Sequence, residues 1–460
     1  MKVTCILLVV FSCALTPALL AQQPTLLTVL HGFAGSPADG AYPYRPLVVG
    51  GNDNAIYGCT PAGGTNGWGT IFRINRDGSG YSVIHNFSDG EQSLPWTIRN
   101  PVLYVTRGSD GALYGTSQSG TNYPNGMVFK LNTDGSGYTV LHGFTNSDAT
   151  PLNLMQGRDG ALYGAGFRAI FKLDTDGGNY NVLHIFNNAS DGTRAYGRLI
   201  QGTDGALYGA TYAGGTNNGG TIFKINTNGT GFTILHTFTN NPDGASAYAG
   251  LTEGSDGALY GVTRLGGTNN VGVIFKLNQD GSGYQILHHF QTNGVDGTYP
   301  YGDLVQGLNN ILYGTTYFGG PTNDGTIFEI GLDGSHYSVL RSFGTSTNVE
   351  PNRPVSGLVQ GPASDGSGVL YGVANWGGGP YGSLYSIVVN PPLSITPLVS
   401  QFAGQPVVAW PAWALNYQLQ STTNLADTNS WVAATNGILM TGFQPAKPSP
   451  GTYYRLVWPQ

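Results

Sequence analysis

The sequence predicts an all-β protein: a seven-bladed β-propeller over residues 22–389, closed by an N-terminal strand and followed by a small β-sandwich over residues 390–460. Three observations predict it. The tripeptide Leu/Ile-Tyr-Gly occurs seven times with a spacing of 45 to 58 residues, a period typical of stacked units that bury their apolar faces against one another. Each copy contains short apolar segments and no 3.6-residue period. Charged residues make up only 10%, while Gly reaches 72 of 460, which suits short strands joined by tight turns. The seven tyrosines are Tyr57, Tyr114, Tyr163, Tyr208, Tyr260, Tyr313 and Tyr371.

Residues 1–21 have the features of a secretory signal peptide. Lys2 supplies a positive start, residues 6–20 are largely apolar, and small Ala21 precedes two glutamines. The apolar run is short for a membrane span and is interrupted by Pro17. We therefore expect a secreted or cell-envelope protein with no membrane span. We also expect it to be a monomer.

The fourth repeat shows the expected strands most clearly. Residues 198–202, 206–211, 221–226 and 232–238 are rich in Ile, Leu, Phe, Tyr and Thr, and we name them a, b, c and d. Asp-Gly and Asn-Gly turns join a to b and c to d, because tight hairpins need positive φ angles. The b–c and d–a connections are longer and differ between repeats. In an up-and-down blade these variable loops share one face.

The strand count predicts how the ring closes. Seven a–b–c sets are present, but the first d-type segment, residues 26–33, precedes every a strand. The last set ends near Val388 with no d strand after it. We expect residues 26–33 to complete this last blade, which would remove the free sheet edges.

The repeated text resembles a known family. Asp-Gly-Ala-Leu-Tyr-Gly, Gly-Thr-Ile-Phe-Lys, Asp-Gly-Ser-Gly-Tyr and Val-Leu-His-x-Phe recur in order between residue 25 and about residue 388. This pattern resembles the GloVer tandem repeat of secreted and surface proteins of environmental bacteria, whose C-terminal anchors vary (choice-of-anchor proteins). The resemblance implies architecture and export, and no defined activity.

Composition changes at Asn390-Pro-Pro392, which predicts a linker. The following 70 residues alternate in several short apolar segments, as a small sandwich does. Residues 417–425, Tyr-Gln-Leu-Gln-Ser-Thr-Thr-Asn-Leu, resemble the fibronectin-III-like modules that end many secreted bacterial proteins.

Charge and cysteine content exclude some classes of partner. After removal of residues 1–21 the chain keeps 18 basic residues (19 minus Lys2) against 25 acidic ones. This balance argues against nucleic acid and anionic membranes as partners. Cys59 would be the single remaining thiol, and we expect a small buried residue there. We predict no cofactor.

Six histidines share one position of the repeat. Because each lies on the outermost strand of a different blade, they cannot converge on a metal ion, and we expect them to bond neighbouring turns. Arg341 takes the position in the seventh copy. The histidines are His31, His85, His142, His184, His236 and His288.

Known catalytic and metal motifs are missing from the sequence. Asn132–Gly137 resembles the start of a calcium loop and the sialidase Asp-box, but it lacks the later acidic ligand of the first and the spacing of the second. We interpret it as hairpin turn chemistry. The d–a loops also repeat an acid before Gly, at Asp39, Asp191, Asp243 and Asp296, which we interpret first as turn formation. We therefore predict no catalytic residue and no metal site from sequence.

The variable loops are rich in aromatic residues among Asn, Gly and Thr. Such rings offer rigid apolar area with hydrogen-bonding tips, and they stack on sugar faces. Other aromatics of these loops are Tyr123, Tyr196, Tyr248 and Phe318, and we expect some of the whole set to fill gaps between blades. The predicted ligand-binding residues are Tyr42, Tyr44, Trp68, Trp96, Tyr212, Tyr299, Tyr301, Tyr317, Trp376 and Tyr381.

Three functions remain open at this level. The first is a non-catalytic module that binds glycan or protein through the b–c and d–a loops. The second is a carbohydrate-active hydrolase or lyase, which needs two carboxylates, or a His and an Arg, around one cavity at the ring centre. The third is a structural spacer.

Overall fold

The computed structural model describes residues 27–51, 53–91, 103–145, 150–307, 310–344, 350–361 and 368–389 in full, and beyond them the backbone of seven strands between residues 398 and 457. The described residues contain strands and turns only, so no helix among them could cross a membrane. The chain divides into a large unit, residues 25–362 with 369–389, and a smaller one that includes residues 390–460.

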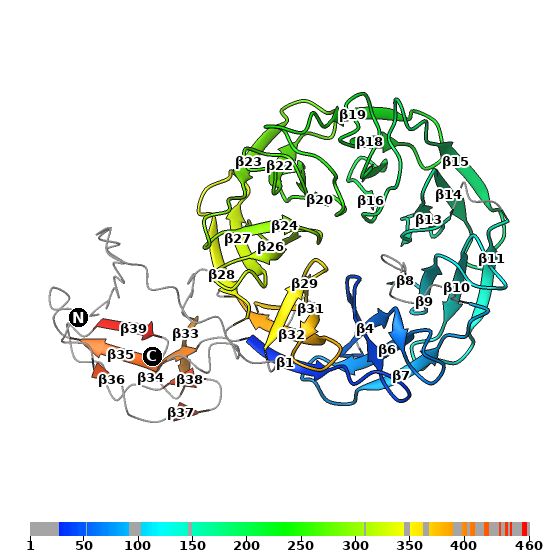
Figure 1. The fold of residues 1–460 in the computed structure, drawn as a ribbon. Coiled ribbons are helices and arrows are strands. Elements are labelled where there is room, and N and C mark those ends of the chain that lie inside the picture. Colours follow the sequence, from blue (N-terminus) through cyan, green and yellow to red (C-terminus); the bar gives the residue numbers. More distant parts are fainter. Residues whose placement is uncertain are drawn as a thin grey trace. The chain divides into compact units, whose positions relative to one another are not determined.

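The large unit is a seven-bladed β-propeller in which antiparallel sheets stand around a ring (Figure 1). Blade 1 is β3 (Val48–Val49), β4 (Ala55–Thr60), β6 (Thr70–Asn75) and β7 (Ser82–Asn86); blade 2 is β8 (Leu103–Arg107), β9 (Leu113–Ser117), β10 (Met127–Leu131) and β11 (Thr139–Gly143). Blade 3 is β12 (Met155–Gln156), β13 (Leu162–Ala165), β14 (Ala169–Leu173) and β15 (Asn181–Ile185); blade 4 is β16 (Ile200–Gln201), β17 (Leu207–Ala210), β18 (Thr221–Ile225) and β19 (Thr233–Thr237). Blade 5 is β20 (Thr252–Glu253), β21 (Leu259–Thr263), β22 (Val273–Leu277) and β23 (Gln285–His289); blade 6 is β24 (Gly297–Pro300), β25 (Val305–Gln306), β26 (Ile311–Gly319), β27 (Thr326–Gly331) and β28 (Ser338–Ser342).

Blade 7 combines both ends of the propeller sequence. It contains β29 (Pro351–Pro354), β30 (Val359–Gln360), β31 (Val369–Gly377), β32 (Ser383–Val388) and, as its outer strand, β1 (Leu27–Gly32). β1 runs antiparallel to β32, with Leu27 opposite Ile387 and Gly32 opposite Ser383. Figure 1 shows blue β1 beside amber β32. Residues more than 350 positions apart in the chain thus share one sheet.

The Leu-Tyr-Gly tripeptide is built into the middle of each blade. In blade 4, Tyr208 is fully buried, and its hydroxyl donates to the Asp204 carboxylate of the a–b turn at 2.8 Å. Lys224 of the next strand contacts the same carboxylate at 2.7 Å. The glycine that follows, Gly209, lies under the Phe223 ring, where an added Cβ would come within 2.5 Å of Cζ. The repeated residues therefore form the scaffold of the fold.

Except for β8 of blade 2, the inner strands of the described blades have only two residues and are shorter than the sequence predicts. Strand a of blade 4 was expected over residues 198–202, but β16 covers only Ile200–Gln201. The residues just before the inner strands bond to the next blade instead: the Asn153 amide donates to the carbonyls of Ala195 and Gly197 at 2.8 and 2.9 Å.

The repeated histidines join neighbouring blades at the rim. Each imidazole stacks on an aromatic ring of the following blade, with centroids 3.5 to 4.0 Å apart. Among the described residues, five of them also contact d–a loop carboxylates, from the pair His31 and Asp39 at 2.9 Å to the pair His85 and Glu91 at 3.8 Å. In the seventh copy Arg341 bonds Glu350 at 2.9 Å. The predicted structural role is confirmed, and the repeated aspartates serve the same contacts.

These rim carboxylates make the fold sensitive to acid. Burial raises the pKa of Glu91, but the His85 imidazole, 3.8 Å away, and the hydrogen bonds from Ser88 outweigh burial and lower the pKa to about 2. A carboxyl whose pKa is lower in the folded than in the unfolded chain stabilises the fold at higher pH, and this contribution is lost as pH falls through the folded pKa. We expect the urea midpoint to fall between about pH 5 and pH 2, and Glu91→Gln to flatten that dependence. If the urea midpoint of Glu91→Gln changed with pH as steeply as that of the unsubstituted protein, this explanation would be contradicted.

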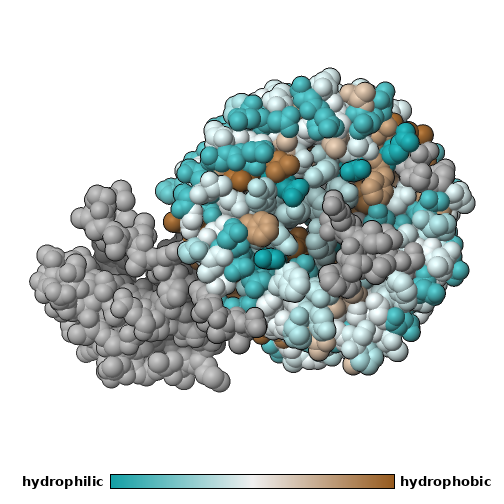
Figure 2. Space-filling view, in the orientation of Figure 1, coloured by the Kyte–Doolittle hydropathy of each residue, from teal (hydrophilic) through white to brown (hydrophobic). Residues whose placement is uncertain are grey.

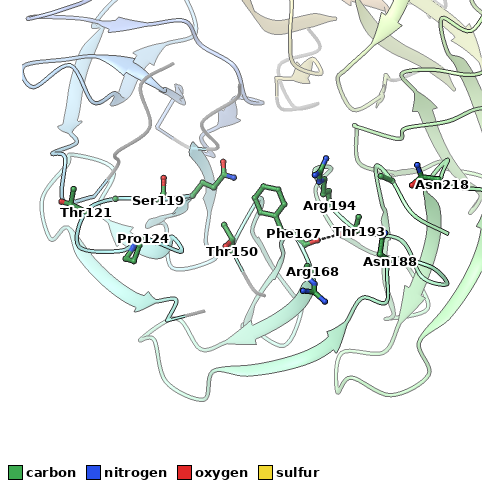
Figure 3. A pocket seen from close by; sticks show the side chains of 13 residues that line it. Ser119, Thr121, Pro124, Thr150, Phe167, Arg168, Asn188, Thr193, Arg194 and Asn218 are labelled. Atoms are coloured by element: carbon green, nitrogen blue, oxygen red, sulfur yellow. Dashed lines mark hydrogen bonds between the residues drawn. The ribbon is translucent and has the colours of Figure 1, made fainter. Parts of the chain in front are cut away.

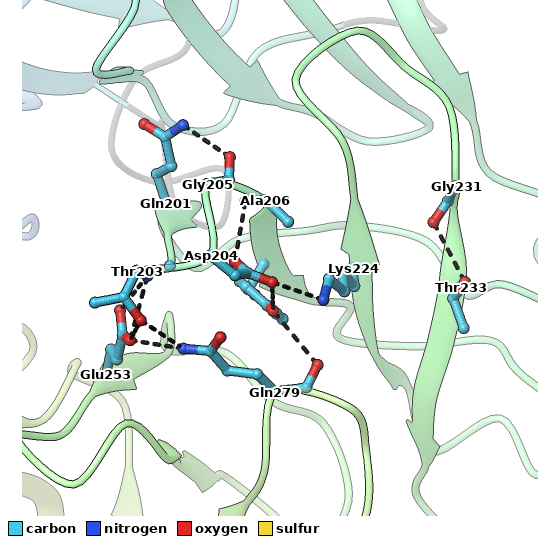
Figure 4. A network of polar contacts seen from close by, with 12 residues as sticks. Gln201, Thr203, Asp204, Gly205, Ala206, Lys224, Gly231, Thr233, Glu253 and Gln279 are labelled. Carbon is cyan, nitrogen blue, oxygen red and sulfur yellow. Dashed lines mark hydrogen bonds and ion pairs between the residues drawn. The ribbon is translucent and has the colours of Figure 1, made fainter.

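A second set of contacts joins the blades on the face of the a–b turns. The backbone amide of a turn residue donates to a Gln or Glu side chain from the inner strand of the next blade. Figure 4 shows the case of Thr203 and Glu253, where the Thr203 hydroxyl donates at 2.6 Å and Gln279 donates to the same carboxylate at 2.6 Å. Contacts between neighbouring blades therefore occur both at the rim and on the face of the a–b turns. Repeated residues make both sets of contacts.

The smaller unit contains two antiparallel sheets. One has the order β33-β34-β38-β37 and the other the order β36-β35-β39. Their bounds are β33 (Leu398–Phe402), β34 (Gln405–Ala409), β35 (Gln418–Thr422), β36 (Val432–Ala433), β37 (Ile438–Leu439), β38 (Gly442–Phe443) and β39 (Tyr453–Val457).

Candidate functional site

The b–c and d–a loops lie on one face of the propeller, which we call the loop face. Each d–a loop pairs with the b–c loop of the blade that it enters, for example through Ala245 opposite Leu265 and Gly297 opposite Gly319. A short two-stranded ladder of β2 (Gly40–Ala41) and β5 (Ala62–Gly63) makes the same contact in blade 1. The loops that vary most in sequence are thus held on a regular frame.

A cavity of about 1050 Å³ opens on the loop face across blades 2, 3 and 4. It exists because the b–c loop of blade 3 is short: three residues, 166–168, connect β13 to β14. The corresponding loops of blades 2 and 4 have nine residues, 118–126, and ten residues, 211–220. The two tall loops form walls, and the short loop forms the floor between them.

The lining of this cavity is polar and contains cations. Figure 3 shows the Phe167 ring between Thr150 and Arg194, with Arg168 on the same loop. Among the described residues, the lining includes two arginines but no carboxylate and no histidine. The lining residues are Gln118, Ser119, Gly120, Thr121, Pro124, Thr150, Phe167, Arg168, Asn188, Thr193, Arg194, Ala213 and Asn218.

The backbone holds Arg194 and Phe167 together. The amide of Arg194 donates to the Phe167 carbonyl at 2.8 Å, and the Thr193 hydroxyl donates to the same oxygen at 2.7 Å. Arg194 has a φ of +59°, a left-handed conformation that costs a non-glycine residue on the order of 1 kcal/mol or more. Such strain persists only where surrounding contacts hold the backbone in this conformation. The Arg194 side chain therefore extends from a rigid backbone position.

The same strained position recurs around the ring. Five d–a loops carry a non-glycine residue with φ between 54° and 59° five positions before the buried Leu of the inner strand. In each case its amide donates to the b–c loop of the preceding blade, as that of Ser246 does to Gly219 at 2.7 Å. These residues are Tyr42, Arg194, Ser246, Tyr299 and Arg353. The fold thus presents one variable side chain per blade at a fixed place.

Four of these loops carry a tyrosine two positions after the left-handed residue, and the four tyrosines lie together near the axis. The Tyr44 and Tyr248 hydroxyls are 3.2 Å apart, although they belong to blades 1 and 5. Tyr196 stacks on Tyr248 with centroids at 4.7 Å, and Tyr301 meets Tyr248 edge-on at 5.1 Å. Burial raises the pKa of Tyr44 well above its usual value. Of the predicted binding residues, Tyr44 is therefore largely enclosed in a cluster of aromatic side chains.

Arginines are inserted among the remaining aromatics of blades 5 to 7. The Arg264 guanidinium lies 5.2 Å from the Tyr301 centroid and 5.8 Å from that of Tyr299, and it donates to the Tyr212 hydroxyl at 3.2 Å. Tyr317 contacts Tyr301 with centroids at 5.3 Å. The predicted residues Tyr212, Tyr299, Tyr301 and Tyr317 thus form one aromatic and cationic surface.

The other predicted residues lie elsewhere. Tyr42 meets Trp376 at 5.6 Å and Tyr381 at 5.5 Å, and the last two are each 38% exposed, so these three form a separate platform between blades 7 and 1. Trp68 is half-buried against a hydrophobic cluster shared by blades 1 and 2. Trp96 lies outside the described residues.

Outside the loop face, the Cys59 thiol and the Asp134 carboxylate have structural roles. Cys59 is buried, its thiol donates to the Leu103 carbonyl at 3.0 Å, and burial raises its pKa to about 12. Within the described ranges, no group of three His, Cys, Asp or Glu side chains could hold a metal ion. Asp134 bonds the backbone and hydroxyl of Ser136 at 2.9 and 2.7 Å, which is the turn chemistry expected from the sequence.

The repeated sequence shows which family the chain belongs to. A model of the Gloeobacter/Verrucomicrobia repeat matches residues 19–168 and 165–385, which is most of the chain. The chain belongs to this repeat family. No curated protein matches it. Each of the two matched segments spans several blades of the propeller.

Solved structures share the propeller at low sequence identity. Virginiamycin B lyase from Staphylococcus aureus is 14% identical with a TM-score of 0.52, covering 79% of this chain and 100% of its own. Oligogalacturonate lyase from Vibrio parahaemolyticus is 11% identical with a TM-score of 0.51, covering 80% and 95%. A chain of the mitotic checkpoint complex is 14% identical with a TM-score of 0.51, covering 83% and 100%. At these identities the likeness shows the fold alone.

Sequence reasoning missed the residues of the cavity. Phe167, Arg168 and Arg194 belong to no motif, and none was predicted as a site residue. One signal was present: the spacing from Tyr163 to Tyr208, 45 residues, is the shortest of the six. A shortened loop between two long ones marks a depression in a propeller face, and this rule would have located the cavity.

Proposed function

We propose that this protein is a non-catalytic binding module that holds an acidic oligosaccharide in the cavity over blade 3. The proposal rests on the composition of the cavity lining. Two arginines, one phenyl ring and several hydroxyl and amide groups line the cavity, and none of the described lining residues is a carboxylate. Guanidinium groups bind carboxylates through paired, charge-assisted hydrogen bonds. An aromatic ring supplies a flat apolar surface for a sugar ring.

The charge distribution supports an acidic ligand. The whole chain has a formal net charge of −6. On the loop face, however, cationic side chains come from blades 3, 4 and 5, at Arg168, Arg194 and Arg264, whereas Arg353 of blade 7 forms an ion pair with Asp324 at 3.9 Å. Most acids of the d–a loops are engaged with histidines at the rim. A local positive field within an anionic protein concentrates anionic ligands at this face.

The size and rigidity of the cavity support an oligomer. A volume of about 1050 Å³ lies just above the range of about 300–1,000 Å³ seen for small-molecule sites. The strained backbone of Arg194 and the Thr193 and Phe167 hydrogen bonds fix the lining before the ligand arrives. Such preorganisation reduces the entropy lost on binding.

The enzyme alternative has less support. It requires two carboxylates, or a His and an Arg, around one cavity at the ring centre, and the described lining of the separate cavity over blade 3 offers neither pair. The name of one similar structure, oligogalacturonate lyase, nevertheless supplies a chemically matched probe. Oligogalacturonate carries one carboxylate per sugar, so binding without cleavage would separate the two functions.

The test compares Arg194→Met with Arg353→Met, because both arginines occupy the same left-handed position of the repeat and only Arg194 lines the cavity. Titration of the full chain with oligogalacturonate is expected to show binding that weakens at least about tenfold in Arg194→Met and in Phe167→Ala. Binding by Arg353→Met is expected to match the unsubstituted protein. Equal losses in Arg194→Met and Arg353→Met would contradict a site in the cavity, and binding confined to protein ligands would replace glycan as the partner.

We further infer the setting of this module. Residues 1–21 direct export, and the protein acts at the cell envelope or outside the cell as a monomer. Residues 390–460 form a fibronectin-III-like β-sandwich from the two sheets of the smaller unit. Pairing of β1 with β32 closes the ring, which keeps the loop face rigid.

A further inference from the structure

The most exposed aromatic rings of the described chain lie together in the platform of Tyr42, Trp376 and Tyr381. Trp376 and Tyr381 are each 38% exposed, and no other described Phe, Tyr or Trp is as exposed. Both rings meet the ring of Tyr42 edge-on, at interplanar angles of 66° and 83°. Single exposed apolar residues are common on protein surfaces, but two exposed rings supported by a third on the loop face indicate a contact with a ligand.

The b–c loop of blade 7 departs from the repeat at this point. In blades 4, 5 and 6 the loop carries an asparagine whose side-chain oxygen accepts from the amide of a loop glycine at 3.0 Å, as Asn218 does from Gly214. Blade 7 has Gly-Gly-Gly-Pro-Tyr-Gly over residues 377–382 instead. Counted from the first glycine, Tyr381 takes the place of the asparagine. A residue that stabilises the loop in three other blades is thus replaced by an exposed ring.

The backbone around Tyr381 exposes its ring and holds it in place. Residues 377–379 are all glycines, so this part of the loop has no side chains that could cover the rings. Gly35 packs against the Tyr381 ring, where an added Cβ would come within 2.8 Å of Cδ2. The Tyr381 amide donates to the Phe33 carbonyl at 3.1 Å, and its carbonyl accepts from the Tyr42 amide at 2.8 Å. The ring is therefore fixed where the first and last blades meet.

The charged side chains of the surrounding loops are engaged elsewhere. Residues 33–47, 350–354 and 374–382 contain four of them. Arg45 is only 7% exposed, with Tyr44 and Tyr248 beside it. The other three have partners on other segments: Asp39 with His31 at 2.9 Å, Glu350 with Arg341 at 2.9 Å and Arg353 with Asp324 at 3.9 Å. None of these described loops offers a free charge beside the rings, so the platform suits a neutral ligand.

The platform is not part of a broad apolar surface. A specific protein interface buries about 1,200 Å² or more in total, and large docking surfaces contain a contiguous apolar patch. The other exposed large apolar side chains of the described chain, Val182, Ile185 and Val295, belong to blade 3 and to the loop that enters blade 6. On the face that Figure 2 shows, apolar residues likewise occur in small groups among polar ones. A small ligand therefore fits the platform better than a protein.

We propose that the platform binds a neutral pyranose ring of a β-1,4-linked glycan, stacked on Trp376 and Tyr381. A pyranose with equatorial hydroxyl groups has an apolar C–H face that packs on an aromatic ring, while its hydroxyl groups stay in water. Tyr42 is the positioning residue, because its ring contacts the other two. This site uses blades 7 and 1 and no charged group, whereas the cavity uses blades 2, 3 and 4 and two arginines. Either site can therefore be present without the other.

The test is calorimetric titration of the full chain with cellotetraose, xylotetraose and mannotetraose, which are neutral β-1,4-linked tetrasaccharides. At least one of them is expected to bind, and Trp376→Ala and Tyr381→Ala should each weaken its binding at least about fivefold. Tyr381→Phe keeps the ring and should bind like the unsubstituted protein. Val295→Ala is the matched control, because Val295 is an exposed apolar residue of another d–a loop and its loss should leave the affinity unchanged.

Two further measurements locate the sugar and separate this site from the acidic cavity. Trp376→Phe should still bind the tetrasaccharide in calorimetry, but it should lose the change in tryptophan emission that the sugar causes in the unsubstituted protein. Arg194→Met should leave tetrasaccharide binding unchanged, and Trp376→Ala should leave oligogalacturonate binding unchanged. Failure of all three tetrasaccharides to bind, or equal binding by Trp376→Ala, would overturn the proposal. Binding of octaproline in place of the sugars would overturn it as well and make the partner a protein.

Discussion

Phe33→Ala is expected to lower the free energy of unfolding by about 3–5 kcal/mol, the range seen when a buried Phe is truncated in a core that cannot collapse. Phe33 is fully buried directly after β1, and its ring lies 5.3 Å from that of Phe72 in blade 1. Its amide donates to the Gly382 carbonyl at 2.9 Å, and its own carbonyl accepts from Tyr381 at 3.1 Å. This one residue therefore joins the first and last blades.

The matched control is Ile185→Ala. Ile185 lies directly before Phe186, the equivalent of Phe33 in another repeat, but it is 56% exposed. Substitution there should change stability by no more than about 0.5 kcal/mol, as is usual at the surface. Urea unfolding followed by tryptophan fluorescence gives both values. A loss below about 1 kcal/mol for Phe33→Ala would contradict the view that β1 closes the ring.

Gly115→Ala is expected to be the next most damaging change, with a loss of about 1–3 kcal/mol or more from overpacking. An added Cβ at Gly115 would come within 2.3 Å of Cζ of the buried Phe129 and within 2.4 Å of the Tyr104 carbonyl oxygen. The second contact is with backbone, so rotation of a side chain cannot relieve it. In all seven copies the glycine of the tripeptide packs against the aromatic ring of the third strand, and at Gly115 the backbone of the inner strand adds a second close contact.

Gly294→Asn serves as the control for Gly115→Ala. Gly294 has a φ of +77° and no atom within 4 Å of an added Cβ, and Asn tolerates this left-handed conformation. Its unfolding midpoint should stay close to that of the unsubstituted protein. If both variants lost the same stability, steric contact with the inner strand would not explain why the tripeptide ends in glycine.

The repeated residues could be predicted from sequence because repetition itself reveals them. Tyr208, Gly209 and Phe223 recur at fixed offsets, so their strands and their burial follow from the pattern. His184 could also be assigned to the rim, since it lies on an outer strand. Its partners Asp191 and Phe232 could not, because they come from a loop and from the next blade, and only the packing of blades brings the three together.

The residues of the proposed binding cavity could not be predicted in the same way. Arg194 and Phe167 are 27 positions apart, and a backbone hydrogen bond between two loops makes them neighbours. Aromatic content alone favoured Tyr44, whose ring is enclosed by other tyrosines near the axis. Loop length indicates where the cavity lies, since the short loop 166–168 forms its floor.

The most direct measurement compares one oligosaccharide in two charge states. Oligogalacturonate and its carboxyl-reduced, neutral counterpart have the same length and linkage, and both can be titrated into the full chain. A cavity built from Arg168, Arg194 and Phe167 should bind the acidic form at least about tenfold more tightly, because charge-assisted hydrogen bonds are lost in the neutral form. Equal affinity for the two forms, or no binding of the acidic one, would contradict an acidic-glycan site on the loop face.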